Sequence, residues 1–173
     1  MARLENLLGA WSLTVVDRMA SAARDTGLSV SDQAAMVTLL AHPDRTVSWL
    51  GEVLALTSSG VTRLVDRLVA AGWVVRSPGD DARQRRLRLT DTGEAIARSV
   101  VRARNEVLAE CVAPLDARTR GQLERALERM LGASSQALPV AMRSCRLCDR
   151  SACRAEGHDC PLDHTKRQEG RDG

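Results

Sequence analysis

The sequence predicts a mainly α-helical protein that carries one small β-hairpin. Most of the chain repeats its apolar residues every three or four positions, which is the spacing of a helix with one buried face. The stretch from Trp73 to Thr90 differs, because it alternates apolar and polar residues around the turn-forming run Pro78-Gly79-Asp80-Asp81. Serine or threonine precedes several helical segments, where its hydroxyl can accept hydrogen bonds from the first helix amides.

Length and composition fit one globular domain, or a domain with an appended module. The chain has 173 residues, of which 44% are hydrophobic and 27% charged. Its three aromatic residues are all tryptophan, so leucine, valine, alanine and methionine must build the core. The net charge of +3 does not identify a partner, but the hairpin region is locally basic and should attract phosphate.

The first twenty residues do not form a secretory signal, because Asp17 and Arg18 interrupt them. No stretch approaches the about 20 apolar residues that span a bilayer. We therefore expect a cytoplasmic protein with no membrane association. In that reducing compartment, clustered cysteines favour metal binding over disulfides.

The N-terminal half predicts four helices. The first ends near Gly27, and its apolar face consists of Leu4, Leu8, Trp11, Val15, Met19 and Ala22. Ser31 is expected to cap the second, which Pro43 stops, and Thr46 to cap a short third from Val47 to Leu54. Thr57 or Ser58 caps the fourth, and Gly72 ends it. Its buried stripe is expected to be Val61, Leu64, Val65 and Leu68.

The hairpin and two further helices follow. In the second strand Arg86 and Arg88 should point outward, while Leu87 and Leu89 point inward. Thr90 caps a long helix that runs to about Ala113 and is apolar over a wide arc, which predicts several packing partners. A last helix covers about 116–131, and a linker follows it.

Two short helices joined by a tight turn and followed by a basic hairpin form a winged helix-turn-helix. The second helix of such a unit fits the major groove of DNA, where base edges can be distinguished. Hydroxyls near its start can bind phosphate, and Arg63 can reach guanine. The candidate contacts from the residues alone are Thr57, Ser58, Ser59, Thr62, Arg63, Arg67, Arg85 and Arg86. The hairpin arginines, Arg88 among them, can also form a solvated face, and Arg67 can instead pair with Asp66 or Asp44.

The run from Val47 to Gly93 resembles the MarR family of winged-helix regulators. The resemblance is carried by VSWLGEVLALTSSGVTRLVDRLVAAGWVVR and by DARQRRLRLTDTG, which contains Asp81-x-Arg83 and Leu89-Thr90-x-x-Gly93. It implies that Arg83 enters the minor groove and that Asp81 orients it. It further implies a homodimer that reads a pseudo-palindromic site in double-stranded DNA, with repression as the favoured mode.

The resemblance extends over roughly residues 4–132 and suggests how the chain is divided. The expected parts are an N-terminal dimerisation helix (1–30), the winged helix-turn-helix (31–92), C-terminal dimerisation helices (93–132), a linker (133–144), a cysteine module (145–164) and a disordered tail (165–173). Trp49 departs from the family pattern. It either packs against a neighbouring helix or lines a cleft for a small-molecule ligand.

The cysteine module has the spacing Cys145-x2-Cys148-x4-Cys153-x6-Cys160. A C-x2-C turn presents two thiolates to one ion, and two further cysteines complete a tetrahedral Zn²⁺ site. An iron–sulfur cluster is the alternative, although the spacing matches neither common ferredoxin pattern. His158 and His164 are substitute ligands. The remaining interpretation is a disordered tail with idle or disulfide-forming thiols, because the segment has few apolar residues to offset its ordering entropy.

The cysteines also raise competing functions. A C-x2-C pair could exchange disulfides in an enzyme, or the module could dock a protein partner. The chain lacks a Ser-His-Asp arrangement, a glycine-rich phosphate loop and the strand–helix context of a thioredoxin-like site, so we expect no enzyme. Cys111 is expected to be a core residue and His42 a surface residue.

Overall fold

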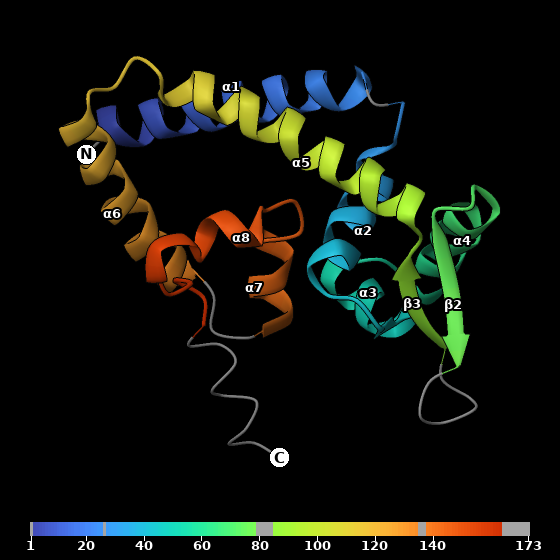
Figure 1. Cartoon of the computed structure of the whole chain (residues 1–173). Helices are drawn as coiled ribbons and strands as arrows, with labels where there is room; N and C mark the ends of the chain where they lie inside the picture. The colour runs from blue at the N-terminus through green and yellow to red at the C-terminus, as the bar shows by residue number, and fades with distance from the viewer. Residues whose placement is uncertain (1, 26, 79–84, 135–137, 164–173) are drawn as a thin grey trace.

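The structure is a computed structural model that describes residues 2–25, 27–78, 85–134 and 138–163. It confirms the mainly helical fold with a small antiparallel sheet. Figure 1 shows two long helices that contact each other, α1 (Ala2–Asp25) and α5 (Asp91–Val112), with α6 (Ala117–Ser134) at one end and the winged-helix unit at the other. That unit contains α2 (Val30–Ala41), α3 (Val47–Leu54), α4 (Ser58–Ala70), β1 (Arg45–Thr46), β2 (Val74–Pro78) and β3 (Arg85–Leu89).

The sheet has the order β1-β3-β2, with both pairs antiparallel. Val74 lies opposite Leu89, and Pro78 lies opposite Arg85. The predicted alternation is confirmed, because Leu87 and Leu89 are buried while Arg88 is exposed. The two-residue strand β1 was not predicted, since it is too short to produce an alternating pattern.

The core lies between the helices of the winged unit and its sheet. Its fully buried side chains include Met36, Leu39, Leu50, Leu68 and Leu87. Burying one such side chain contributes roughly 1.5–3 kcal/mol relative to leaving it in water. Leucine, valine, alanine and methionine therefore build this core, with Trp49 and Trp73 partly buried against it.

Helix caps agree with the sequence at three starts and differ at one. The side chains of Thr46, Thr57 and Thr90 each accept a hydrogen bond from a helix amide. The predicted cap Ser31 is wrong, because α2 begins at Val30 and Ser29 caps it. The Ser29 hydroxyl accepts from the Asp32 amide at 3.1 Å and donates to its carboxylate at 2.6 Å, so the two residues bond reciprocally.

Two glycines are required by backbone geometry. Gly72 ends the α4 region with φ +73°, a left-handed conformation that favours glycine. Gly93 lies so close to the carbonyl of Trp73 that a Cβ would overlap it. Glycine at this position therefore lets the start of α5 pack closely against Trp73, the residue before β2.

The C-terminal region folds further than expected. The predicted linker contains helix α7 (Leu138–Ser144), and the cysteine module continues with α8 (Arg150–Cys153) and a 3₁₀ turn (Ala155–Gly157). Figure 1 shows this region between α6 and the α2–α3 part of the winged unit. Helix α7 packs against α3, so the segment that precedes the cysteine module contacts the winged unit directly.

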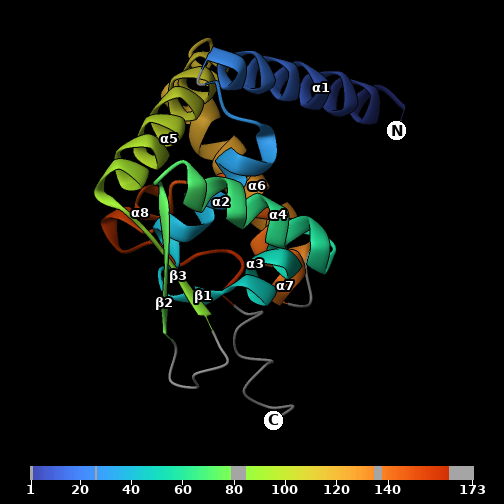
Figure 2. The same cartoon turned by 90° about the vertical axis from the view of Figure 1, so that its right-hand side faces the viewer.

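The long helices expose much apolar surface. Figure 2 shows the N-terminal part of α1 projecting from the rest of the molecule. Its exposed apolar side chains include Leu4, Leu7, Leu8, Trp11 and Leu13. No described residue of α6 is buried. Within the described ranges, no helix has the length and hydropathy to cross a membrane.

Candidate nucleic-acid interface and cysteine module

The exposed face of α4 carries polar residues that the sequence pattern indicated as candidate DNA contacts. A tight turn joins α3 to α4, and Ala55 takes a left-handed conformation with φ +55° in it. The apolar stripe of α4 is buried as predicted. The opposite face is therefore turned to solvent, and its residues Thr57, Ser58, Ser59, Thr62 and Arg63 are all exposed.

Local bonds hold the hydroxyls at the start of α4. Thr57 Oγ1 accepts from the Gly60 amide at 3.1 Å, and Ser59 Oγ lies 3.4 Å from it. The Thr62 hydroxyl donates to the Ser58 carbonyl at 2.8 Å. These groups stay accessible next to unpaired amides at a helix N-terminus, which is a suitable environment for a phosphate.

The two arginines of α4 differ in their surroundings. Arg63 is exposed and has no hydrogen bond or ion pair among the described residues. Arg67 instead pairs with Asp32 of α2 at 2.5 Å, and the Asp32 side chain is only 9% exposed. The partner of Arg67 is thus neither Asp66 nor Asp44, which pair with Arg76 and Arg88.

The hairpin arginines also separate into free and bound groups. Arg85 is exposed and without a described partner, whereas Arg86 donates to the Asp44 carbonyl at 2.9 Å. Arg88 binds both carboxylate oxygens of Asp44, at 3.1 and 2.6 Å, and holds the pKa of that carboxyl below its usual value. Asp81 and Arg83 lie outside the described residues.

The sequence did not single out Arg143 of α7. This exposed residue lines the same surface hollow as Ser58 and Thr62 at the start of α4. No local sequence pattern could have indicated the place of Arg143, because the sequence did not predict where the linker that contains it packs. The docking of α7 on α3 brings this charge to the edge of the α4 surface.

The four cysteines of the module gather around one cavity of about 70 Å³. Cys145, Cys148, Cys153 and Cys160 all line it, together with His42 and Leu162 among others. All four are free thiols. His158 faces a different hollow, next to α6, and His164 lies outside the described residues.

The thiols differ in acidity. A hydrogen bond from Cys145 and the nearby charges of Arg104 and Arg146 lower the pKa of Cys148 to about 6. The same hydrogen bond, with burial, raises the pKa of Cys145, and burial raises that of Cys153. One thiolate therefore forms readily at neutral pH, and Cys145 donates to it.

Arg104 of α5 is the main cation beside the module. Its Nη2 lies 3.9 Å from Cys148 Sγ, and its buried Nε has no hydrogen-bond partner among the described residues. A partly buried guanidinium with an unused donor favours negative charge next to it. A four-thiolate metal centre is anionic and would supply that charge.

Donor chemistry and charge thus fit a metal, but the side chains are not drawn together around one point. In the described ranges, no three His, Cys, Asp or Glu side chains form a group that could hold an ion. Closing a site would require the four thiols to move inward around their shared cavity.

Polar contacts attach the module to both halves of the molecule. On the α2 side, Thr38 Oγ1 donates to the Arg146 carbonyl at 3.3 Å. On the α5 side, the Asn105 amide donates to the Asp149 carboxylate at 3.3 Å. The module therefore bridges helix α2 of the winged unit and the long helix α5.

The structure places three further residues whose roles were expected from the sequence. Trp49 packs on the core, with His42 5.6 Å from its ring and the Arg45 guanidinium 5.0 Å above it, as the packing interpretation requires. His42 also lies 3.2 Å from Arg150 of the module, so it is more than a surface residue. Cys111 is buried on α5, which agrees with a core role.

Comparison with known proteins agrees with the fold. A sequence model of the MarR family matches residues 26–84, from the end of α1 to the hairpin. A search of curated proteins by sequence found no match. The family match and the structural neighbours together support a winged helix-turn-helix fold of the MarR type.

Among solved structures, a MarR family protein from Bacillus stearothermophilus has a TM-score of 0.67 and 29% identity, over 75% of this chain and 91% of its own. The YusO protein of Bacillus subtilis has a TM-score of 0.67 and 22% identity, over 78% and 96%. A MarR family protein of Mycobacterium tuberculosis, solved with DNA, has a TM-score of 0.62 and 22% identity, over 75% and 98%. At such identities these likenesses establish the fold.

Proposed function

We propose that this protein is a homodimeric, DNA-binding transcriptional regulator of the MarR type, acting as a repressor on a pseudo-palindromic operator. The observation that carries the proposal is the exposed polar face of α4, on which Arg63 has no partner among the described residues, together with the basic hairpin that follows this helix. The M. tuberculosis neighbour solved with DNA supports it. In this arrangement α4 enters the major groove, and the hairpin lies along the adjacent minor groove.

The structure refines the proposed contact set. Thr57, Ser58, Ser59 and Thr62 serve phosphates at the helix start, and Arg63 serves a base edge. Arg85 is available to the backbone of DNA, and Arg83 with Asp81 completes the hairpin tip as the family resemblance implies. Arg67 and Arg86 hold protein partners and are assigned to positioning.

A DNA mobility-shift assay with fragments of the source genome tests the proposal. Arg63→Ala and Arg83→Ala should each weaken specific binding by roughly 1–3 kcal/mol, about fivefold to 150-fold. Arg129→Ala, on the exposed face of α6, removes the same charge and should leave affinity within about twofold. Equal affinity of all three variants would contradict the assignment of α4 and the hairpin.

The exposed apolar surface of α1 and α6 supports the proposed homodimer. A single chain leaves Leu4 74% exposed and Leu13 67% exposed. Large exposed apolar patches on a water-soluble protein mark interaction surfaces. A second copy of the chain is the partner that the family resemblance implies.

The four cysteines of the module are proposed to hold Zn²⁺, with an iron–sulfur cluster as the alternative. A bound zinc would supply a closed, redox-inert crosslink between short loops that have little core of their own. The chain's own contribution is the set of thiols around one cavity and the charge of Arg104 beside Cys148.

Anaerobic purification, metal analysis and a visible spectrum test the metal. About one zinc per chain in a colourless protein supports the zinc site, whereas a brown protein with iron and sulfide supports the cluster. A metal-free protein that binds neither would overturn the metal proposal and leave the DNA-binding proposal to its own assay.

A further inference from the structure

A histidine of the winged unit, His42, lines the cavity that the four cysteines share. It directly follows α2, and its amide donates to the Thr38 carbonyl at 2.9 Å, so the backbone of His42 is fixed at the helix end. The cavity of about 70 Å³ is far smaller than the roughly 300–1,000 Å³ of organic-ligand sites, yet larger than the roughly 10–15 Å³ that one water needs. Thiols and an imidazole around a space of this size suit a metal ion.

The C-x2-C turn is attached to α2 one helical turn from His42. The carbonyl of Arg146, which lies between Cys145 and Cys148, accepts from Thr38 Oγ1 at 3.3 Å. Thr38 and His42 are four residues apart, so both lie on the same side of α2. The turn that carries the first two thiols is therefore held against the side of α2 that ends in His42.

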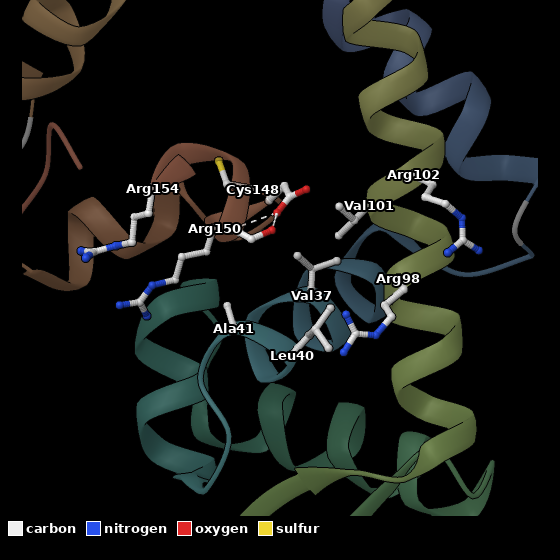
Figure 3. Close-up of a pocket in the computed structure, with 11 residues that line it drawn as sticks. Val37, Leu40, Ala41, Arg98, Val101, Arg102, Cys148, Arg150 and Arg154 are labelled. Carbon is white, nitrogen blue, oxygen red and sulfur yellow. Dashed lines mark hydrogen bonds between the residues drawn. The ribbon is translucent and has the colours of Figure 1, made fainter. Parts of the chain in front are cut away.

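Arg150 of α8 contacts His42 without engaging one ring nitrogen alone. Figure 3 looks into the neighbouring hollow between α2, α5 and the module, which four arginines line, and shows Arg150 on the side of Ala41, the last residue of α2. Its Nη1 lies 3.2 Å from Nδ1 and 3.4 Å from Nε2 of His42. A donor in line with one ring nitrogen would lie much farther from the other. The contact with Arg150 thus leaves the ring able to direct a nitrogen into the cavity.

The other candidate donors at the cavity are less suitable. Both carboxylate oxygens of Asp163 accept from Arg154, at 2.7 and 2.6 Å, so this carboxylate is already paired. Cys153 is exposed and also lines the separate hollow beside α6, whereas the other three thiols of the module are partly buried. Among the described thiols of the module, Cys153 is therefore the least enclosed.

We propose that His42 is a ligand of the metal centre, in the set Cys145, Cys148, Cys160 and His42. This inference rests on the zinc site proposed above and exchanges one of its ligands, Cys153, for a histidine from the winged unit. Three cysteines and one histidine form a common structural zinc set, with a tetrahedral arrangement. The side chains must still move inward to close it, as in a four-cysteine site. The ion then crosslinks the module to the end of α2 and not only to its own loops.

Cobalt substitution in the full-length protein tests the ligand set. In oxygen-free, reducing buffer, Co²⁺ replaces zinc, and its thiolate charge-transfer band grows with the number of bound thiolates. The visible bands of tetrahedral Co²⁺ also move to longer wavelength when sulfur replaces nitrogen. His42→Cys should therefore strengthen the charge-transfer band by about one third, from three thiolates to four, and shift the visible bands to longer wavelength.

Two further variants complete this experiment. His42→Ala should also alter the visible bands, because water or Cys153 then takes the place of the nitrogen. His158→Ala is the matched control, since His158 faces the hollow beside α6, and it should keep the wild-type spectrum. Circular dichroism checks that each variant retains its helix content.

Alkylation of the zinc-loaded protein identifies the thiol outside the ligand set. Iodoacetamide followed by mass spectrometry should modify Cys153 at least about tenfold faster than Cys145, Cys148 and Cys160, because metal-bound thiolates are protected. A strong chelator should remove this difference.

The possible failures are distinguishable. Identical cobalt spectra of the wild type, His42→Ala and His42→Cys, or equal protection of all four thiols, would overturn this inference and leave a four-cysteine zinc site in place. An iron–sulfur cluster in the purified protein would also overturn it, because four thiolates already complete that centre. A protein that binds neither cobalt nor zinc would overturn the inference together with the zinc proposal.

Discussion

Arg63 and Arg67 lie about one turn apart on α4, yet their environments assign them different tasks. Arg63 is exposed and unpaired in the described residues, so its charge is available to DNA. Arg67 joins α4 to α2 through Asp32, whose side chain is 9% exposed. Removing one partner of such a pair leaves a carboxylate poorly solvated, which is costlier than losing a surface pair.

The first prediction concerns this pair. Arg67→Ala should lower the free energy of unfolding by about 1–2 kcal/mol, a value reduced from that of a buried pair because Arg67 itself is 55% exposed. Urea denaturation followed by circular dichroism measures it. The matched control is Glu94→Ala, which breaks the exposed pair with Arg98 and should cost less than about 0.5 kcal/mol. Equal effects of the two changes would refute the anchoring role of Arg67.

Gly93 gives a second prediction at the same scale. Gly93→Ala places a methyl group on the Trp73 carbonyl, so it should lower the free energy of unfolding by about 2–4 kcal/mol. Gly121→Ala is the control, since its new Cβ meets only the end of the Arg125 side chain. That change should be neutral or stabilise by up to about 1 kcal/mol through helix propensity. Thermal unfolding of both variants separates the effect of the close contact at Gly93 from the general effect of replacing a helical glycine by alanine.

Among the elements, α7 connects two proposed functions. It packs on α3, and Arg143 on it shares a hollow with Ser58 and Thr62. Beyond α7, the cysteine module buries few apolar groups; Leu162 is its one buried leucine in the described residues. The module thus has little hydrophobic stabilisation of its own, and the proposed metal would hold its loops.

The third prediction uses Arg143. Arg143→Ala should weaken operator binding about twofold to fivefold and reduce its salt dependence, as expected for a single phosphate contact. Mobility shifts at two salt concentrations provide the measurement. Arg118→Ala on α6 is the control, because its side chain lies outside the α4 surface. An unchanged salt dependence in Arg143→Ala would exclude a phosphate contact there.

Removal of the metal gives the fourth prediction. A strong chelator should make residues 145–163 sensitive to trypsin, because without a crosslink the module cannot offset its ordering entropy. The winged unit, with its own core, should remain resistant. Limited proteolysis with mass spectrometry locates the cuts, and Cys148→Ser should reproduce the effect without chelator. Full resistance of the stripped module would show that the metal, if bound, has no structural role.

At the scale of the whole molecule, the exposed apolar surface of α1 and α6 determines the expected assembly. These helices leave their leucines in water in a single chain, although α5 covers part of α1. Paired chains would bury this surface and set the separation of the two α4 helices. We therefore expect a two-fold symmetric dimer to bind an operator with matching two-fold symmetry.

The fifth prediction follows from that surface. Leu8→Arg should shift the protein from dimer to monomer or lower its solubility, because a charge would be buried at the contact. Light scattering after size-exclusion chromatography gives the mass. Val75→Arg, at an exposed apolar position on β2, is the control and should keep the dimer mass. A dimer that persists unchanged in Leu8→Arg would exclude this part of α1 from the interface.

The order of helices, the hairpin and most helix caps could be predicted from the sequence, because periodicity and capping are local properties. Thr46, Thr57 and Thr90 illustrate this, since each bonds an amide three residues away. Ser31 failed as a cap because a nearby serine had the better reciprocal partner in Asp32. The cysteine spacing likewise predicted that the four thiols lie close together, and all four line one cavity.

Only the tertiary structure decided which arginines are free. Arg63, Arg67, Arg86 and Arg88 look alike in sequence, but Asp32 and Asp44 bind three of them from other elements. It also decided that the cysteine module docks between α2 and α5 and so creates a basic hollow. The physical reason is that ion pairing and cavity formation depend on distances between residues far apart in the chain, whereas helix periods and caps depend on neighbours.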